Sequence, residues 1–245
     1  MNTMTAKIFR REFASYFATP VAFVFLVIFL VMTGFFTFYL GNFYERGAAD
    51  LVSFFSFHPW LYLFLMPALS MRLWAEERKN GSIELLLTLP INTWQAVLGK
   101  FLAAWAFAGV ALLLTMTIWL TVTYLGDPDN GVIFAAYIGS WLMAGGFLAI
   151  GSCLSAITRN QVIAFILTVV ICFMFLLLGL GQVDGFLRGI LPQVIVDAIA
   201  SLSFLTHFNS LSKGIIDLRD VVYFAAVMGF WLLASVQVIE MKKAD

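Results

Sequence analysis

The sequence predicts an all-α polytopic membrane protein, and three observations point to this class. Hydrophobic residues make up 62% of the 245 residues and charged residues only 11%, with a mean hydropathy of +0.96. A soluble core cannot enclose so much apolar surface. The apolar residues form runs of about 20 residues, the length that a helix needs to cross a bilayer. Ionisable residues are nearly absent from the middles of these runs.

Six runs have this length, so we expect six membrane-spanning helices in a single domain that covers residues 1–245. Their approximate limits are 20–40, 58–75, 94–125, 134–157, 161–181 and 221–239. The third run is longer than a bilayer requires, and we expect its beginning to project into the cytoplasm or to tilt. No internal repeat or linker marks a second domain.

Residues 3–17 are too polar to cross a membrane and are typical of an amphipathic helix at the cytoplasmic interface. A signal peptide is the competing interpretation, because a basic stretch precedes an apolar run. The run from Val21 to Leu40 is too long for one and lacks an A-x-A-like cleavage site. The interfacial helix carries its cations and aromatic rings at Lys7, Arg10, Arg11, Phe13 and Phe17.

The distribution of cations predicts that both termini are cytoplasmic. With the N-terminus inside, ten of the fourteen lysines and arginines fall on the inner side, as the positive-inside rule requires. These are Lys7, Arg10, Arg11, Arg72, Arg78, Lys79, Lys100, Arg159, Lys242 and Lys243, with Arg72 and Lys100 expected to snorkel to the inner face.

The fourth run is dense in small residues spaced four apart, which lets helix backbones approach closely in lipid. We interpret these residues as packing sites within the chain, and part of the face could instead form a dimer contact. The pairs are Ser140 with Ala144, Gly145 with Ala149, and Gly151 with Ser155.

The long outer segment before the last run predicts short helices that cap the outer mouth of the bundle. Pro192 to Leu205 is apolar but interrupted by Asp197, and is too short to span, so it indicates an interfacial or re-entrant helix. The amphipathic piece that follows is broken at Gly214.

The sequence carries little that indicates chemistry. It has no G-x-x-x-x-G-K-[ST] motif for ATP, no G-x-S-x-G or H-E-x-x-H motif, and no net charge that would favour nucleic acid. His58 and His207 are expected to be ordinary interfacial residues rather than metal ligands. Cys153 and Cys172 are expected to be small packing residues. The absence of carboxylates and histidines near the midplane argues against an ion-coupled carrier.

The strongly charged stretch 75–93 separates two long apolar runs and predicts a short cytoplasmic helix between them. Gly81 can end the preceding helix, and Ser82 can cap a new one with Glu84 in its first turn. Pro90 then stops it, because the residue before a proline avoids the α region.

That helix is too short to be stable alone and needs a surface to pack on. The residue pair Asn92 and Gln95 resembles a capping box that starts the third run. The short helix either docks in a groove of a partner or lies in the bilayer interface, and its apolar residues are compatible with both. They are Ile83, Leu85, Leu86, Leu87 and Leu89.

Residues 75–90, AEERKNGSIELLLTLP, resemble the coupling-helix signature E-E-x-x-x-G-[ST]-x-E-x-L-L-x-x-P of ABC-2 type transporter permeases. Further stretches are similar to the gliding-motility and nitrous-oxide-accessory branch of that family. They are RREFASYFATPVAF, VLGKF, LGDPDNG, TRNQVIAF and HFNSLSKGIIDLRDVVYF.

The resemblance implies a half-transporter of the exporter type in a bacterial inner membrane, surrounded by lipids. It would pair with a second permease copy, as a homodimer, and with two nucleotide-binding ATPase subunits that hold ATP and magnesium, while this chain itself holds no cofactor. An extracytoplasmic accessory protein could join the complex, and no nucleic acid is expected.

The resemblance also assigns roles to residues. Closure of the ATPase subunits would move the coupling helix and rock the first, second and fifth spans. The coupling residues would be Glu76, Glu77, Arg78, Gly81, Ser82, Ile83, Glu84, Leu85, Leu86, Leu87, Thr88 and Pro90, with the first three at the polar rim of the ATPase cleft. The outer gate, within residues 186–212 and the turn that follows, would include Pro192, Asp197, Phe204 and Gly214.

Two other functions stay open at this point. One is a channel or carrier that works without an ATPase. The other is a non-transporting membrane anchor through which an ATPase acts on an extracytoplasmic protein. The apolar spans do not indicate a substrate.

Overall fold

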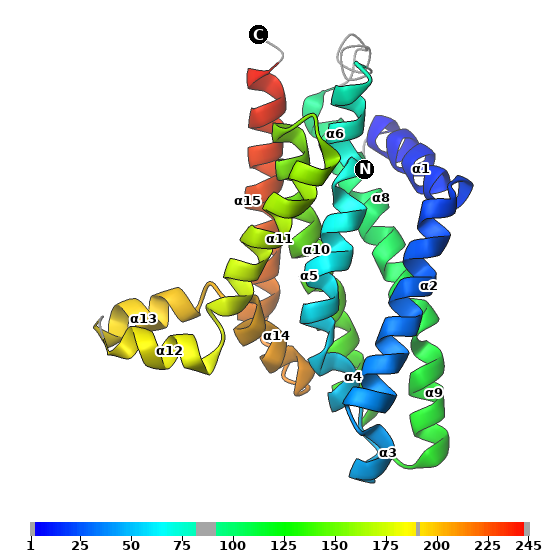
Figure 1. Cartoon of the computed structure of the whole chain (residues 1–245), viewed down its shortest axis with the longest axis vertical. Coiled ribbons are helices and arrows are strands. Elements are labelled where there is room, and N and C mark those ends of the chain that lie inside the picture. The colour runs from blue at the N-terminus through cyan, green and yellow to red at the C-terminus, as the bar shows by residue number, and fades with distance from the viewer. Residues whose placement is uncertain (1–2, 82–91, 190–191, 243–245) are drawn as a thin grey trace.

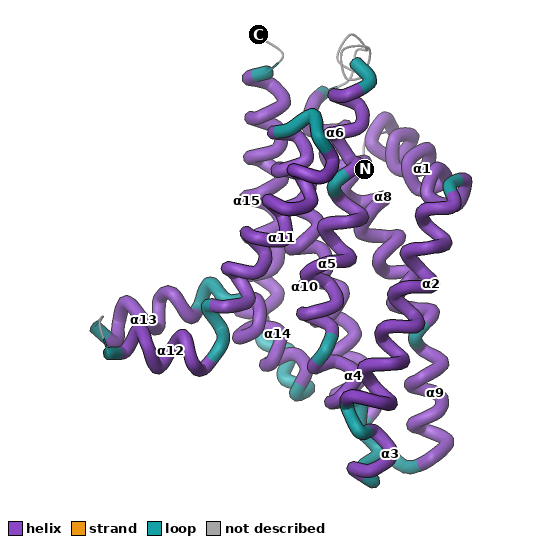
Figure 2. The backbone as a smooth tube through the Cα atoms, in the orientation of Figure 1, coloured by secondary structure: helices purple, strands orange, loops and turns teal. Residues whose placement is uncertain are grey.

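A computed structural model describes residues 3–81, 92–189 and 192–242, and within these ranges the chain is built from helices with no strand (Figures 1 and 2). The predicted all-α class is therefore confirmed for the described residues. The elements are α1 (Thr3–Ala18), α2 (Pro20–Phe35), the π-helix η1 (Phe36–Leu40), α3 (Phe43–Arg46), α4 (Val52–Ser56), α5 (His58–Ser70), α6 (Arg72–Lys79), α8 (Thr93–Leu114), α9 (Met116–Leu125), α10 (Asn130–Ile157), α11 (Gln161–Leu177), α12 (Gly181–Arg188), α13 (Gln193–Ala200), α14 (Phe204–Ser212) and α15 (Leu218–Met241).

Helix α10 is the centre of the bundle and packs against α5, α6, α8, α11, α14 and α15. In its most apolar window 72% of residues are buried, compared with 28% in the corresponding windows of α2–η1 and α15. Close packing depends on its small residues. A side chain at position 151 would place its Cβ 1.9 Å from the Ser70 Oγ. Helices α5 and α10 can therefore pack this closely only because residue 151 is a glycine. The predicted packing within the chain is thus confirmed at this position.

Four helical segments are long and apolar enough to cross a membrane: Ala22–Leu40, Thr93–Leu125, Asn130–Ile157 and Leu218–Met241. Helices α13 and α14 would make a fifth if the pair, which is bent by 67°, counts as one span. Among the described residues, the expected spans 58–75 and 161–181 correspond to the shorter helices α5 and α11. Helix α5 has 13 residues and α11 has 17, so length and composition do not confirm the count of six.

The elements are sorted between the two ends of the bundle (Figure 1). The beginning of α1, the end of α15, the end of α6 and the connection from α10 to α11 lie toward one end, and α1 runs crosswise to α2 near that end. At the other end lie α3, α4, α14 and the end of α9, while α12 and α13 project sideways. That α1 begins and α15 ends toward the same end is consistent with an even number of crossings between them.

Exposed apolar side chains cover the outer helices. On α2 they include Val24, Val27 and Val31, each more than half exposed, and on α11 Val162 and Ile166 are equally open. A soluble protein rarely exposes so large an apolar surface, whereas a bilayer covers it at no cost. The fold and its surface together indicate an integral membrane protein.

Candidate functional site

The predicted coupling residues are only partly described by the structure. Ser82, Ile83, Glu84, Leu85, Leu86, Leu87, Thr88 and Pro90 lie outside the described residues, as does everything else from 82 to 91. Glu76, Glu77, Arg78 and Gly81 are described, as is the start of α8 after this segment. The candidate site is therefore built from the two flanks of residues 82–91 and from the elements that hold these flanks.

Both flanks end in the helix caps that the sequence predicts. After α6, the Asn80 amide donates to the Glu76 carbonyl at 3.0 Å, and Gly81 takes a left-handed φ of +70°. Glycine adopts this conformation without a steric cost, which makes it a usual residue at the end of a helix. Before α8, Asn92 Oδ1 accepts the Trp94 amide at 3.2 Å, and the Gln95 side chain accepts the Asn92 amide at 3.4 Å. The predicted glycine stop and capping box are confirmed.

A single serine of α10 fixes α6 to the centre of the bundle. The helix that began at His58 breaks at Met71, next to the first turn of α6. Ser155 Oγ donates to the Met71 carbonyl at 2.8 Å and accepts the amides of Trp74 and Ala75 at 3.1 and 3.0 Å. The freed backbone groups at the break are thereby satisfied inside the bundle, where an unpaired polar group would be costly.

Two of the predicted rim residues are engaged within the chain. Glu76 pairs with Arg72 one turn earlier, with 2.9 Å between Oε2 and Nε. Arg78 donates to the carbonyls of Ala156 and Ile157 at 2.5 and 3.2 Å, at the end of α10 where carbonyls lack helical partners. Burial, and then the nearby cation Arg159, lower the pKa of Arg78.

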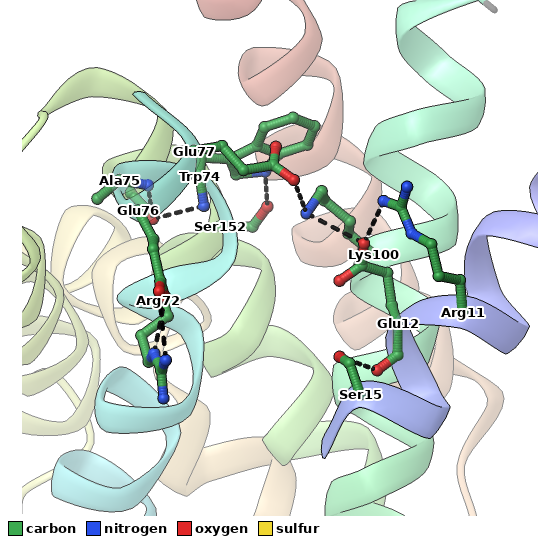
Figure 3. A network of polar contacts seen from close by, with 11 residues as sticks. Arg11, Glu12, Ser15, Arg72, Trp74, Ala75, Glu76, Glu77, Lys100 and Ser152 are labelled. Atoms are coloured by element: carbon green, nitrogen blue, oxygen red, sulfur yellow. Dashed lines mark hydrogen bonds and ion pairs between the residues drawn. The ribbon is translucent and has the colours of Figure 1, made fainter. Parts of the chain in front are cut away.

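The third rim residue, Glu77, belongs to a buried ion cluster around Lys100 of α8 (Figure 3). The Lys100 ammonium lies 2.8 Å from Glu77 Oε1 and 3.4 Å from Glu12 Oε1 of α1. It also lies 5.2 Å from the ring centroid of Trp74, within range of a cation–π interaction. We refer to Glu12, Glu77 and Lys100 as the Lys100 cluster.

The expectation that Lys100 snorkels to the membrane surface is wrong. Its side chain is only 4% exposed. A lysine side chain reaches for water when no partner is near, but here two carboxylates and an indole face satisfy the ammonium inside the protein. The three charges come from α1, α6 and α8, so the cluster joins the crosswise helix to both flanks of residues 82–91.

Glu12 is held in its charged form by this environment. Burial acts to raise the pKa of Glu12, but the Lys100 ammonium and the Arg11 guanidinium outweigh it, and the pKa is lowered from its ordinary value of 4.5. Arg11 Nη2 lies 2.6 Å from Glu12 Oε1. Glu12 is not among the predicted site residues, although it is the one carboxylate in a basic stretch, and Lys100 is predicted only to lie near the inner membrane surface.

The predicted interfacial helix is confirmed as a helix, and its place at the membrane surface stays a prediction. Phe13 stacks on Phe9 at 5.6 Å and meets Phe17 edge-on at 5.3 Å. Ile8 is buried against α8, where a Cβ at Gly99 would come within 2.8 Å of it. The cations Lys7, Arg10 and Arg11 of this helix are exposed.

The predicted gate segment consists of two helices rather than one from Pro192 to Leu205. Helix α13 ends at Ala200, and α14 begins at Phe204 with Ser203 as its cap, because the Ser203 hydroxyl accepts the Leu205 amide at 3.1 Å. Phe204 is fully buried in the bundle.

Of the other predicted gate residues, Pro192 and Gly214 flank these helices and Asp197 lies within α13. Pro192 precedes α13, and Asp197 of α13 lies 3.8 Å from Arg188 of α12. Gly214 follows α14 with a φ of +85° and confirms the predicted break.

Both histidines are buried, contrary to the expectation of interfacial residues. His207 Nδ1 lies 2.6 Å from Asp220 Oδ1, and its ring stacks on Tyr223 with centroids 3.8 Å apart. The Ser201 carbonyl can only accept, so the 2.9 Å contact shows that His207 Nε2 carries a proton. This group ties the turn before α14 to the start of α15.

His58 is fully buried among aromatic rings, with Phe54 at 4.5 Å and Phe55 at 5.3 Å between centroids. Neither ring nitrogen has a hydrogen-bond partner in the part of the chain that is described. The described residues hold no group of three histidine, cysteine or carboxylate side chains that could bind a metal ion.

The helical bundle has an apolar outer surface, which is typical of a membrane-embedded protein. At one end of the bundle, the Lys100 cluster joins α1, α6 and α8. Residues 6–239 match the family model described as ABC-2 family transporter protein, and the chain therefore belongs to this family. No curated protein matches the chain. Membership makes the chain a membrane component of an ABC transporter rather than its catalytic ATPase, and it implies an ATPase partner. The gliding-motility and nitrous-oxide-accessory branch is not supported by this match.

Proposed function

We propose that this chain is the permease subunit of an exporter-type ABC transporter in the cytoplasmic membrane. It forms one domain of six spans, in which α5 with the start of α6, and α11, complete the four longer segments. Two copies pair as a homodimer, and ATP and magnesium are bound by separate ATPase subunits. Both termini lie in the cytoplasm, at the end of the bundle that carries most of the cations.

The Lys100 cluster is the observation that supports this proposal most directly. The coupling signature covers residues 75–90, and the cluster joins α6, which precedes residues 82–90, to α8, which follows them. Buried charges hold their geometry because leaving one unpaired costs several kcal/mol. A displacement of residues 82–90 is therefore passed to α1 and α8 together, rather than being absorbed by a loose loop.

Force then reaches the rest of the bundle through defined contacts. Ser155 transmits motion of α6 to α10, because three of its hydrogen bonds go to α6 and to the break before it. The apolar side chains of Ile83, Leu85, Leu86 and Leu87 dock in a groove of the ATPase subunit, with Ser82 and Glu84 at the start of the short helix and Thr88 and Pro90 at its end. Helices α13 and α14 act as the outer gate.

The coupling assignment is tested in the purified complex of this chain with its ATPase subunit. We expect Glu84→Arg and Leu86→Asp to abolish the change in ATPase activity that the permease causes, while membrane insertion stays normal. Glu45→Arg, an exposed charge reversal at the opposite end of the bundle, is the matched control and should leave coupling intact. Normal coupling in both Glu84→Arg and Leu86→Asp contradicts the docking assignment.

A further inference from the structure

A cavity of about 280 Å³ lies where α1 turns into α2 beside α5 and α6. One part of its wall is apolar and includes Phe25 and Ile28 of α2 and Leu65 and Ala68 of α5. Val24 and Ile28 line the cavity and are also 55% and 44% exposed on the outside of the bundle. The cavity therefore opens onto the surface that the bilayer covers. Its volume is close to the lower limit of about 300 Å³ for ligand pockets, enough for part of a lipid.

The other part of the wall is polar and electrically balanced. It includes two cations, Arg72 and Lys100, and two carboxylates, Glu12 and Glu76. Lys100 is engaged by the carboxylates of its own cluster. Arg72 uses Nε and Nη2 for Glu76, which leaves further N–H groups of its guanidinium. Glu12 uses only Oε1 in its ion pairs, so Oε2 can accept another donor.

Tyr16 adds a hydroxyl to this polar wall. Its ring stacks on Phe107 with centroids 4.9 Å apart, and the residue lines the cavity. The hydroxyl has no hydrogen-bond partner among the described residues. Burial, followed by the Glu12 carboxylate, raises the pKa of Tyr16, so the hydroxyl remains protonated and able to donate. The cavity thus presents unused donors and an unused acceptor next to an apolar wall.

We propose that this cavity binds a phospholipid with a phosphoethanolamine head. The phosphate accepts from Arg72 and Tyr16, the ammonium donates to Glu12 and Glu76, and the first part of an acyl chain lies on the apolar wall. A primary ammonium has three N–H donors for the carboxylates, whereas a choline head has none. A purely anionic head meets the two carboxylates without a cation of its own. The inference does not depend on the ATPase or on the coupling role of residues 82–90.

The bound lipid lies between α5 and the turn that joins α1 to α2. Glu12 belongs both to the cavity wall and to the Lys100 cluster. A lipid bound in the cavity therefore affects the position of α1. The position of α1 then depends on which phospholipids the inner leaflet contains.

The proposal is tested with the full chain in nanodiscs that contain a trace of photoactivatable lipid. Ethanolamine, choline and glycerol heads are compared with identical acyl chains, and the labelled peptides are mapped by mass spectrometry. We expect the ethanolamine lipid to label residues 24–28 and 65–69 about two- to tenfold more than the other two, the range that one net hydrogen bond is worth. Equal labelling by the three heads, or labelling only elsewhere, would overturn the proposal.

Two variants separate the head group from the apolar wall. Tyr16→Phe keeps the ring on Phe107 but removes a donor to the phosphate that all three heads share, so it should reduce labelling by all three lipids, whereas Tyr39→Phe, exposed on η1, should not. Ala68→Phe fills the cavity and should remove labelling by every lipid, with Ala225→Phe on exposed α15 as its control. Unchanged labelling in Tyr16→Phe, or unchanged labelling in Ala68→Phe, contradicts the site. Size-exclusion profiles show that each variant is folded.

Discussion

Replacing Lys100 with methionine removes the cation of the Lys100 cluster and keeps most of the side-chain volume. Glu77 and Glu12 lie 2.8 and 3.4 Å from the ammonium, and their side chains are 21% and 17% exposed. At an effective dielectric constant of 20, these distances correspond to about 6 and about 5 kcal/mol of Coulomb energy, before desolvation is subtracted. Breaking a buried pair costs about 3–5 kcal/mol. Because water reaches both carboxylates partly, we expect the lower limit, about 3 kcal/mol, or roughly a hundredfold in the unfolding equilibrium.

The measurement is unfolding of the purified chain in micelles, followed by tryptophan fluorescence. Lys79→Met is the matched control, because this lysine is exposed at the end of α6 and its loss should change stability by less than about 0.5 kcal/mol. Adding Glu12→Gln and Glu77→Gln to Lys100→Met removes all three charges and should recover most of the lost stability. If Lys100→Met alone is as stable as Lys79→Met, the cluster does not hold the three helices together.

Three further perturbations test other parts of the structure. The lowered pKa of Glu12 stabilises the fold above pH 4.5, and this contribution should be lost as the pH falls below that value. Glu12→Gln should therefore flatten the pH dependence of unfolding below pH 4.5. His58→Phe should be neutral or stabilising, because no hydrogen bond is lost. His207→Phe should lower the free energy of unfolding by about 2–3 kcal/mol, because Asp220 is left buried without its partner. Thermal unfolding of the two variants gives the comparison. Gly151→Val should destabilise the bundle by about 1–3 kcal/mol through overpacking against α5, measured in the same unfolding assay.

Local chemistry made several features predictable from the sequence. The interfacial stretch 3–17 corresponds to α1, the glycine at 81 ends α6, and Asn92 caps α8. Each of these depends on residues within one or two turns of each other. Hydropathy likewise located the long helices, because a run of about 20 apolar residues has few alternatives to a helix in a bilayer.

Contacts between distant segments could not be predicted in this way. The pairing of Glu12 with Lys100 depends on how α1 crosses α8, which no local pattern specifies. The break at Met71 lies inside an apolar run, and only the position of Ser155 on α10 makes it tolerable. His207 and Asp220 also meet through packing of α14 on α15, so two residues that seemed unrelated in the sequence form one buried pair.

The docking of residues 82–90 on an ATPase subunit is the central claim, and site-specific photo-cross-linking measures it directly. A benzophenone amino acid is placed at Leu86 in the assembled complex, and another at Tyr124, which is 91% exposed at the far end of the bundle. We expect an adduct with the ATPase subunit at Leu86 and none at Tyr124, with a yield at Leu86 that changes when ATP is added. A complex that co-purifies intact but gives no adduct at Leu86 would contradict the account.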